Sequence, residues 1–369
     1  MNNNKEYSDI GADLNLDKIE KLNDLLNEHI QKSIGNSKFN IFSSYLSGID
    51  KVKNTLIESD VSRQGYVFIG RPVLNLRSSS LRQDRILALI DTISSNTVAF
   101  YIRCMLDPIF SNKIEISNII EHSNLLNNQL PFIPLLTNTI KTMSGWPDPV
   151  LNTESTEGGF FSENFTFAKG FDDLRKSVTL TLNFRDIQGS PVLSLFTIWF
   201  RFIHLVTRGI VLAYNKYIEE RKMCYSCSIY RFVLDTSGKY IKYWGKATGS
   251  FPLSYPIGGY LNYDVTSPIS NFGNDISIPF MVNAPEMMDP IILNDFNMWI
   301  KRFCPYIENY EVLTQDEQIY NNFKGIPFIN ISSGSNELEW RIDPEEKTQD
   351  PYSSISYILD SIKGVKTKS

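Results

Sequence analysis

The stretch SVTLTLNFR, residues 177–185, decides the fold class. Its apolar and polar residues alternate strictly, and the apolar positions are Val178, Leu180, Leu182 and Phe184. A period of two is typical of a β-strand that buries one face, because successive side chains of a strand point to opposite sides. The stretch therefore predicts a central strand with one face on a hydrophobic core.

A helix and a hairpin are expected directly after this strand. Residues 192–217 are mainly apolar and predict a helix, with Ser190 as its N-cap and Pro191 at its first position. The runs 224–234 and 239–246 flank a turn of Asp-Thr-Ser-Gly and predict a β-hairpin. The order of strand, helix and hairpin indicates an α+β core.

Further elements are expected on both sides of this unit. Apolar or alternating runs predict strands at residues 66–69, 259–264 and 276–282. Apolar side chains at helical spacing predict helices, at residues 17–34, 81–93, 114–126, 290–303 and 353–362. The predicted fold class is α+β: an antiparallel β-sheet or barrel-like core with flanking helices and a helical N-terminal part.

The chain of 369 residues is expected to divide into three parts. Residues 1–150 are predicted to be mostly helical with one strand, and residues 151–285 to form the β-rich core. Residues 286–369 are predicted to hold a helix and a polar extension. The polar segment 152–159, NTESTEGG, reads as a flexible loop and is the best internal boundary.

The composition is that of an ordinary globular protein, with 42% hydrophobic and 21% charged residues. The net charge of −5 argues against nucleic-acid binding as the main function. Aromatic residues make up 12% of the chain, which favours half-buried strands or large protein interfaces. The most apolar stretch, 192–212, contains Arg201, His204 and Arg208, so we expect a helix buried in protein and no membrane span.

The sequence holds no pattern of residues that indicates catalysis. The pair Cys224 and Cys227 lacks the second pair of ligands that a zinc site needs, and we expect it to be structural. No histidine lies in a nucleophile motif, and no phosphate-binding loop is present. The acids near the central unit lie in or beside predicted loops, as solvated acids usually do: Glu154, Glu157, Asp172 and Asp173. We therefore expect no catalytic residue, no cofactor and no metal.

Four segments resemble virion structural proteins of large tailed bacteriophages, of the tail-tube and baseplate-hub type. The first is YVFIGRPVLN at 66–75, and the second is SGWPD at 144–148. The third is 179–189, and the fourth is WGKATGSFP at 244–252. The resemblance covers about residues 65–285, so the first 64 residues and the C-terminal part stand outside it.

The resemblance implies a subunit of an oligomeric ring. In such proteins antiparallel sheets join around the ring, and stacked rings form a channel for DNA. The implied partners are further copies of the chain and other phage tail proteins, with passive contact to DNA, in a virion tail assembled in the host cytoplasm. The loops 153–159 and 251–259 are then expected at subunit contacts. The candidate interface residues are Arg71, Pro72, Trp146, Phe160, Phe161, Tyr243, Trp244, Phe251 and Tyr255.

Three other functions compete with the ring subunit of a tail tube or baseplate hub. A neck, tail-terminator or fibre-attachment protein belongs to the same class of virion proteins. A tail-associated enzyme that degrades cell wall needs two convergent acids or a metal. The third function is DNA binding, and the acidic net charge of the chain argues against it.

Overall fold

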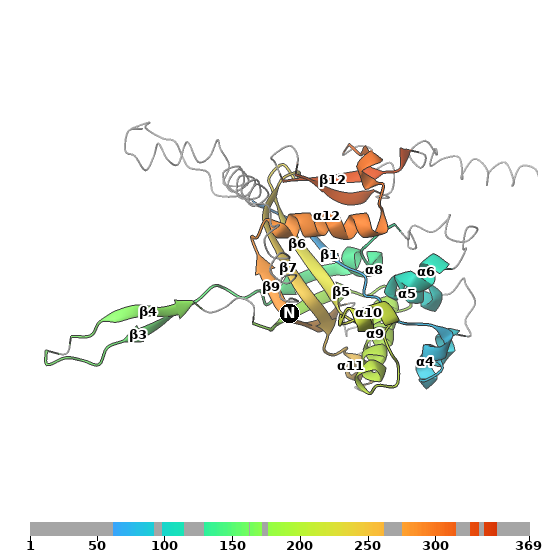
Figure 1. Ribbon diagram of the computed structural model, residues 1–369, viewed down its shortest axis with the longest axis horizontal. Helices are drawn as coiled ribbons and strands as arrows, with labels where there is room; N and C mark the ends of the chain where they lie inside the picture. Colours follow the sequence, from blue (N-terminus) through green and yellow to red (C-terminus); the bar gives the residue numbers. More distant parts are fainter. Residues whose placement is uncertain are drawn as a thin grey trace, which may run out of the picture.

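The computed structural model describes residues 62–91, 98–113, 129–161, 163–171, 176–261, 275–314, 325–331 and 336–344. A central antiparallel sheet organises these residues, and its strands lie in the order β1-β6-β7-β8-β5-β2, with β9 also paired to β7 (Figure 1). The strands are β1 (Ser62–Ile69), β2 (Ile140–Ser144), β5 (Val178–Arg185), β6 (Cys227–Asp235), β7 (Ile241–Pro252), β8 (Asp275–Val282) and β9 (Ala284–Met287).

The strand β5 forms as its alternation predicts. Leu180, Leu182 and Phe184 are fully buried, whereas the residues between them are half-buried or exposed. An unbroken antiparallel register joins β5 to β8, in which Leu180 faces Phe280 and Leu182 faces Ile278. Each pair places two apolar side chains on the same face of the sheet. The predicted fold class is confirmed: the protein is α+β and antiparallel.

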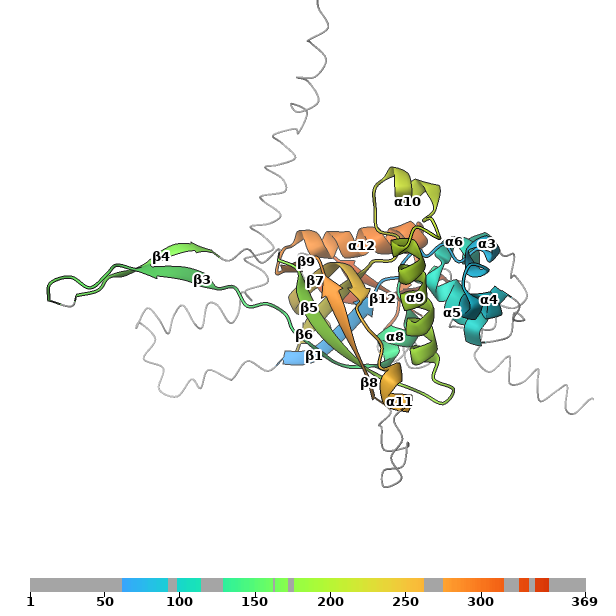
Figure 2. The same cartoon turned by 90° about the horizontal axis from the view of Figure 1, so that it is seen from below.

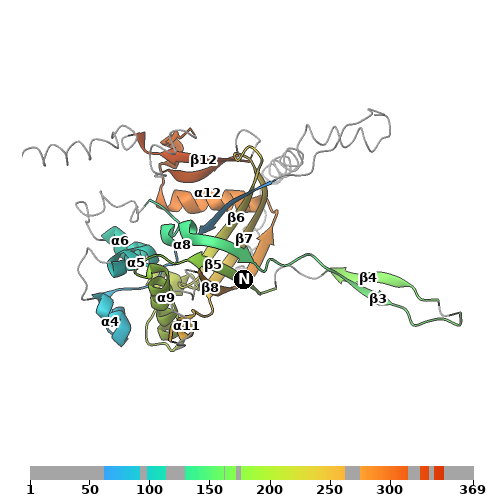
Figure 3. The same cartoon turned by 180° about the vertical axis from the view of Figure 1, so that it is seen from behind.

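Helices cover both sides of the sheet. They are α3 (Ser78–Leu81), α4 (Arg85–Asp91), α5 (Val98–Leu106), α6 (Pro108–Lys113), α8 (Pro134–Thr139), α9 (Pro191–Thr207), α10 (Asn215–Glu219), α11 (Ile257–Leu261) and α12 (Ile291–Phe303). A small sheet of β10 (Glu311–Val312), β12 (Glu337–Ile342) and β11 (Ile326–Asn330) adds a further layer. Figure 3 shows α12 between this small sheet and the central sheet.

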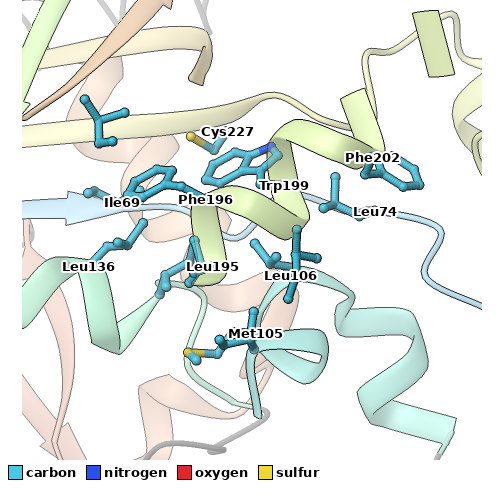
Figure 4. Close-up of a cluster of buried hydrophobic side chains, with 14 of the residues drawn as sticks. Ile69, Leu74, Met105, Leu106, Leu136, Leu195, Phe196, Trp199, Phe202 and Cys227 are labelled. Carbon is cyan, nitrogen blue, oxygen red and sulfur yellow. The ribbon is translucent and has the colours of Figure 1, made fainter. Parts of the chain in front are cut away.

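The first hydrophobic core lies between α9, α5 and the concave face of the sheet. Trp199 is fully buried, stacks on Phe196 and donates its indole N–H to the carbonyl of Tyr225 at 2.9 Å. Figure 4 shows Phe196 and Trp199 beside Cys227 of β6. This arrangement explains why so apolar a helix forms here: α9 is buried by protein on most of its sides.

The second hydrophobic core lies between α12, the small sheet and the other face of β1, β6 and β7. Phe296 of α12 is its centre and lies within 5.3 Å, between ring centroids, of Phe68, Phe132, Tyr230 and Phe232. Adjacent residues of β6 face different cores, because Ile229 belongs to the first and Tyr230 to the second. The β1–β6–β7 half of the sheet is therefore covered on both faces.

Within the described residues the central sheet does not close into a barrel. The end strands β1 and β2 each pair with one neighbour in the sheet order, β6 and β5 respectively, and not with each other. Among the described strands, only β1 and β2 lie before residue 150, and they share this sheet with strands of the predicted core. The three-part division of the chain stays a prediction.

Several predicted elements need correction. The predicted helix at 192–217 is two helices, because Gly209 has a positive φ of 70° and ends α9. Ser190 precedes α9 but makes no side-chain cap. The predicted strand at 259–264 starts inside α11, and the predicted flexible loop at 152–159 starts with strand β3 (Leu151–Ser155). The predicted helices at 17–34, 114–126 and 353–362 lie outside the described residues.

Candidate assembly surfaces

A β-hairpin projects from the body of the protein. It consists of β3 and β4 (Thr166–Phe171), which pair with each other and not with the central sheet (Figures 1 and 2). Phe160 and Phe161 lie at its tip with 95% and 85% of their surface exposed, and their rings meet edge to face at 5.3 Å between centroids. Sequence analysis selected both residues, and the structure places them side by side at the outermost end of the hairpin.

Two side-chain interactions add to the backbone pairing of β3 with β4. The two strands are joined across the hairpin by Ser155 and Thr166, whose hydroxyl oxygens are 2.8 Å apart, and by an ion pair of Lys169 with Glu154 at 2.9 Å. Two-stranded hairpins are marginally stable in water, and exposed ion pairs add little. Large apolar side chains gathered at an exposed tip usually mark a site of protein contact. The hairpin is therefore a surface suited to association.

A groove of about 1000 Å³ separates β1 from β2. Its floor and walls come from both end strands, from α8 and from the small sheet. The lining side chains include the aromatic residues Tyr66, Phe68, Phe132 and Trp340 and the cationic residues Lys141 and Arg231. In the part of the chain that the structure describes, no carboxylate lies among the lining residues. Sequence analysis missed this groove, because the strands that border it are 70 residues apart in the chain.

The groove is closed at one end by hydrogen bonds. The backbone N–H of Ile133 donates to the carbonyl of Ile69 at 2.8 Å, and the N–H of Ile69 donates to the Thr137 hydroxyl at 3.4 Å. The open part of the groove runs along residues 64–68 of β1 and 140–143 of β2. The end strands of a sheet have backbone groups on one side that can pair with another chain.

The outer face of β5 and β8 is mainly polar and uncharged, and its charged residues, Arg185 and Asp275, face each other at one end of the two strands. Thr179, Thr181 and Asn183 alternate on β5 with the buried leucines, and Ser277 is exposed on β8. Asn183 donates to the Thr142 hydroxyl of β2 at 2.6 Å, so the same face continues onto the end strand. Hydroxyl and amide side chains can form hydrogen bonds, but they carry no net charge and so create only a weak electrostatic field. The face is suited to contact with water or with a passing polyanion.

Arg71 and Pro72 lie inside the protein. Arg71 is 4% exposed, and its guanidinium donates to the carbonyls of Cys104 at 2.6 Å, Met105 at 3.1 Å and Leu130 at 3.3 Å. Burial lowers the pKa of Arg71 to about 10, and the nearby Cys104 and Asp107 oppose the change. Pro72 is also buried. Both residues therefore join segments within one subunit.

A second buried charge lies next to this arginine. Asp107 is completely buried and accepts hydrogen bonds from the backbone N–H groups of Leu76 and Phe110, each at 2.9 Å, and from the Tyr214 hydroxyl at 2.7 Å. Burial raises the pKa of Asp107, although these hydrogen bonds and Arg103 act against the shift. The hydrogen bonds of Asp107 therefore connect α6, the segment after β1 and Tyr214.

Three candidate aromatic residues lie close together on the central sheet. Tyr243 and Trp244 are neighbours on β7, with 46% and 5% of their surface exposed, and the Trp244 indole donates to the carbonyl of Asp289 at 2.8 Å. Trp146 is half-buried and packs against Gly245, where a Cβ atom would lie 3.1 Å from its ring. Tyr243 therefore offers the most accessible surface of the three.

The last two candidates lie near the end of β7. Phe251 is half-buried and meets Tyr225 edge to face at 5.6 Å between ring centroids. Tyr255 is also half-buried and meets Phe200 of α9 at 5.3 Å. The structure does not bring these residues together with the hairpin tip. A role of the candidate residues in an interface stays a prediction.

The described residues hold no group of acids, cysteines or histidines arranged for a metal ion. Cys224 and Cys227 are buried and free, and burial raises the pKa of Cys224 to about 11 and that of Cys227 further. Glu154 is engaged with Lys169 on the exposed hairpin. Asp172 and Asp173 lie outside the described residues. Among the described helices, none is long and apolar enough to cross a membrane.

Three solved structures resemble part of the chain. The tube-terminating cap of the anti-feeding prophage is 16% identical over 40% of this chain and 79% of that chain, with a TM-score of 0.25. The PVC sheath/tube terminator of an extracellular contractile injection system is 15% identical over 41% and 85%, with a TM-score of 0.23. The PVC sheath–tube complex is 16% identical over 40% and 80%, with a TM-score of 0.24. Similarity at these TM-scores does not establish a shared fold.

The sequence itself shows the family. No curated protein matches the chain. Residues 14–350, however, match the model of a family described as "Putative phage tail tube protein". This match covers most of the chain and includes the hairpin, the groove and both hydrophobic cores. The chain belongs to this family of phage tail tube proteins and is a structural protein of a phage tail.

Proposed function

We propose that the chain is a ring-forming subunit of a tail tube or baseplate hub, and that copies of it join through the projecting hairpin. The single observation that carries this proposal is the hairpin tip with Phe160 and Phe161 almost fully exposed. Exposing two adjacent phenylalanines to water costs free energy, since burying a phenylalanine side chain is worth about 1.5–3 kcal/mol. A second subunit that covers the tip recovers this free energy.

The ring we propose has the outer face of β5 and β8 toward its channel. Thr179, Thr181 and Asn183 give this face hydroxyl and amide groups, and its one cation on β5, Arg185, lies at the end of the strand opposite Asp275. DNA that passes along such a face meets few groups that bind phosphate strongly, because tight binding to DNA depends on clusters of Lys and Arg. The subunit then works in the virion tail, with other tail proteins as neighbours, after assembly in the host cytoplasm.

The proposal assigns no reaction to the protein. A cell-wall-degrading enzyme of the tail is the competing function, and it predicts soluble fragments when the protein is incubated with peptidoglycan. The acids Glu154 and Glu157 are exposed on the hairpin, where water screens charge. Catalytic acids usually have a pKa changed by burial or by a close charge. Both acids belong to a surface of contact in our proposal.

The experiment is the mass of the purified full chain in solution, together with negative-stain images. We expect rings, or tubes made of stacked rings, and we expect the variant with Phe160→Ser and Phe161→Ser to stay monomeric with an unchanged Tm. Long tubes would identify a tube subunit, and single rings would identify a hub or terminal position. A control with Leu212→Ser removes an apolar side chain that is 67% exposed outside the hairpin and leaves assembly intact. A wild-type chain that stays monomeric at all concentrations would contradict the proposal.

A further inference from the structure

We infer that the groove between β1 and β2 is the receptor for the hairpin tip of a second copy of this chain. The inference rests on the proposed function, since it names the site at which the hairpin of one subunit meets the next. Three independent properties of the groove support it: the chemistry of its walls, its charge, and its position between the two end strands of the described sheet.

The walls of the groove match the chemistry of the tip. Tyr66 and Trp340 meet edge to face at 5.6 Å between ring centroids, and Phe68 and Phe132 lie 5.0 Å apart. Tyr66 is 41% exposed, so an aromatic surface is open to solvent in the groove. Aromatic rings prefer offset and edge-to-face contacts with other rings. The volume of about 1000 Å³ is at the upper end of what protein pockets offer, so more than one phenylalanine side chain fits.

The charge of the groove is opposite to the charge of the hairpin. Residues 151–171 contain three glutamates, Glu154, Glu157 and Glu163, and one lysine, Lys169. Among the described residues, the groove is lined by Lys141 and Arg231 and by no carboxylate. Lys141 is 44% exposed and pairs with Asp275, which does not line the groove. Complementary charge of this kind steers association and fixes the orientation of the partners.

Arg231 forms hydrogen bonds with uncharged groups, so its positive charge can still attract a carboxylate. Its guanidinium donates to the backbone carbonyls of Tyr66 at 3.4 Å and Phe232 at 3.0 Å and to the Gln64 side chain at 3.2 Å. These partners are neutral. Burial lowers the pKa of Arg231, which indicates that its charge is poorly solvated. An approaching glutamate of the hairpin would supply the missing negative charge.

The strands that border the groove offer backbone hydrogen bonds. In the central sheet β1 pairs with β6 and β2 pairs with β5, and the sides of β1 and β2 that face the groove lie at the two ends of the strand order. An extended segment binds such an edge by adding a strand, and its side chains then enter the adjacent pockets. The hairpin projects away from the body in Figures 1 and 3, so its tip reaches a groove on another copy.

Disulfide formation between two variants, each with one added cysteine, tests the inference. One variant carries Phe160→Cys at the hairpin tip, and the other carries Asn138→Cys in α8, where Asn138 is exposed at the groove. The native cysteines are buried, so the new thiols react first. After mixing and mild oxidation we expect a linked pair of chains at a yield several-fold above that of the control. The control pairs Phe160→Cys with Met298→Cys, which is 63% exposed on α12 outside the groove.

The outcomes separate the inference from the proposed function. If rings form but the groove variant links no better than the control, the docking site is wrong and the ring proposal stands. If the groove variant links preferentially but no rings form, the docking site is supported and the ring proposal is contradicted. Adding Glu157→Lys to the hairpin variant should lower the linked fraction in low salt but not in 1 M NaCl. An unchanged linked fraction in low salt would contradict the role of charge.

Discussion

At the scale of single residues, Arg71 joins three separate segments of the chain through one guanidinium group. Its carbonyl partners lie 33, 34 and 59 residues away in the sequence, in α5 and in the segment before α8. Cys104 and Met105 lie in the last turn of α5, where carbonyls have no N–H donor within the helix, and Leu130 lies outside the described helices and strands. A buried arginine can satisfy several of them at once because it carries five N–H donors.

Replacing Arg71 by methionine should destabilise the protein strongly. The side chain keeps its volume, but three buried carbonyls lose a donor, and each unsatisfied buried group costs about 1–3 kcal/mol. We expect Arg71→Met to lower the free energy of unfolding by about 3 kcal/mol or more, measured by urea denaturation. The matched control is Arg82→Met, whose side chain is 74% exposed and whose ion pair with Asp91 is worth at most about 1 kcal/mol. Equal midpoints for the two variants would contradict this account.

The sequence identified Arg71 as unusual but did not predict its role. Pro72 makes the local backbone extended, and this is visible in the sequence. The partners of the guanidinium are backbone carbonyls, which every residue has, so nothing in the sequence singles them out. Phe160 and Phe161 illustrate the opposite case. Two adjacent aromatic residues next to a polar turn were selected from the sequence, and their exposure follows from their place at a hairpin tip.

At the scale of elements, a strong local pattern made prediction reliable. The strand β5, the hairpin of β6 and β7, and helix α12 all form close to their expected positions. Each has a regular apolar spacing over several residues, and the core covers the apolar side. Strand β3 was missed because residues 152–159 read as a polar loop, and every residue of β3 is exposed. The two glycines at 158–159 are the local signal that predicts a turn there.

The strand β1 depends on a glycine at its bulge. Gly65 has a φ of 66°, and a Cβ atom there would lie 2.1 Å from the carbonyl oxygen of Phe232. We expect Gly65→Ala to lower the free energy of unfolding by about 2 kcal/mol or more, since strained backbone conformations cost about 1–3 kcal/mol before any steric clash. Gly170→Ala is the control, because nothing lies within 4 Å of its Cβ position, and its effect should stay within about 0.5 kcal/mol. Thermal unfolding of both variants measures the difference, and a small effect of Gly65→Ala would show that the bulge can adapt.

At the scale of the whole molecule, the order of the strands in the sheet could not be predicted from the sequence. The sheet places β1 beside β6 and β2 beside β5, so pairing joins residues 160 or more apart in the first case and about 40 apart in the second. Local patterns carry no information about such partners. The groove follows from this order alone, since it lies between the two strands left at the ends of the sheet.

The central claim is that copies of this tail tube protein assemble into rings through the hairpin, with the polar face of β5 and β8 toward a channel. A cryo-EM reconstruction of the particle formed by the full chain tests it most directly. We predict a ring in which Thr179 and Thr181 line the channel and Phe160 is covered by a neighbouring subunit. A particle in which the hairpin tip stays exposed and this face of the sheet points outward would contradict the account.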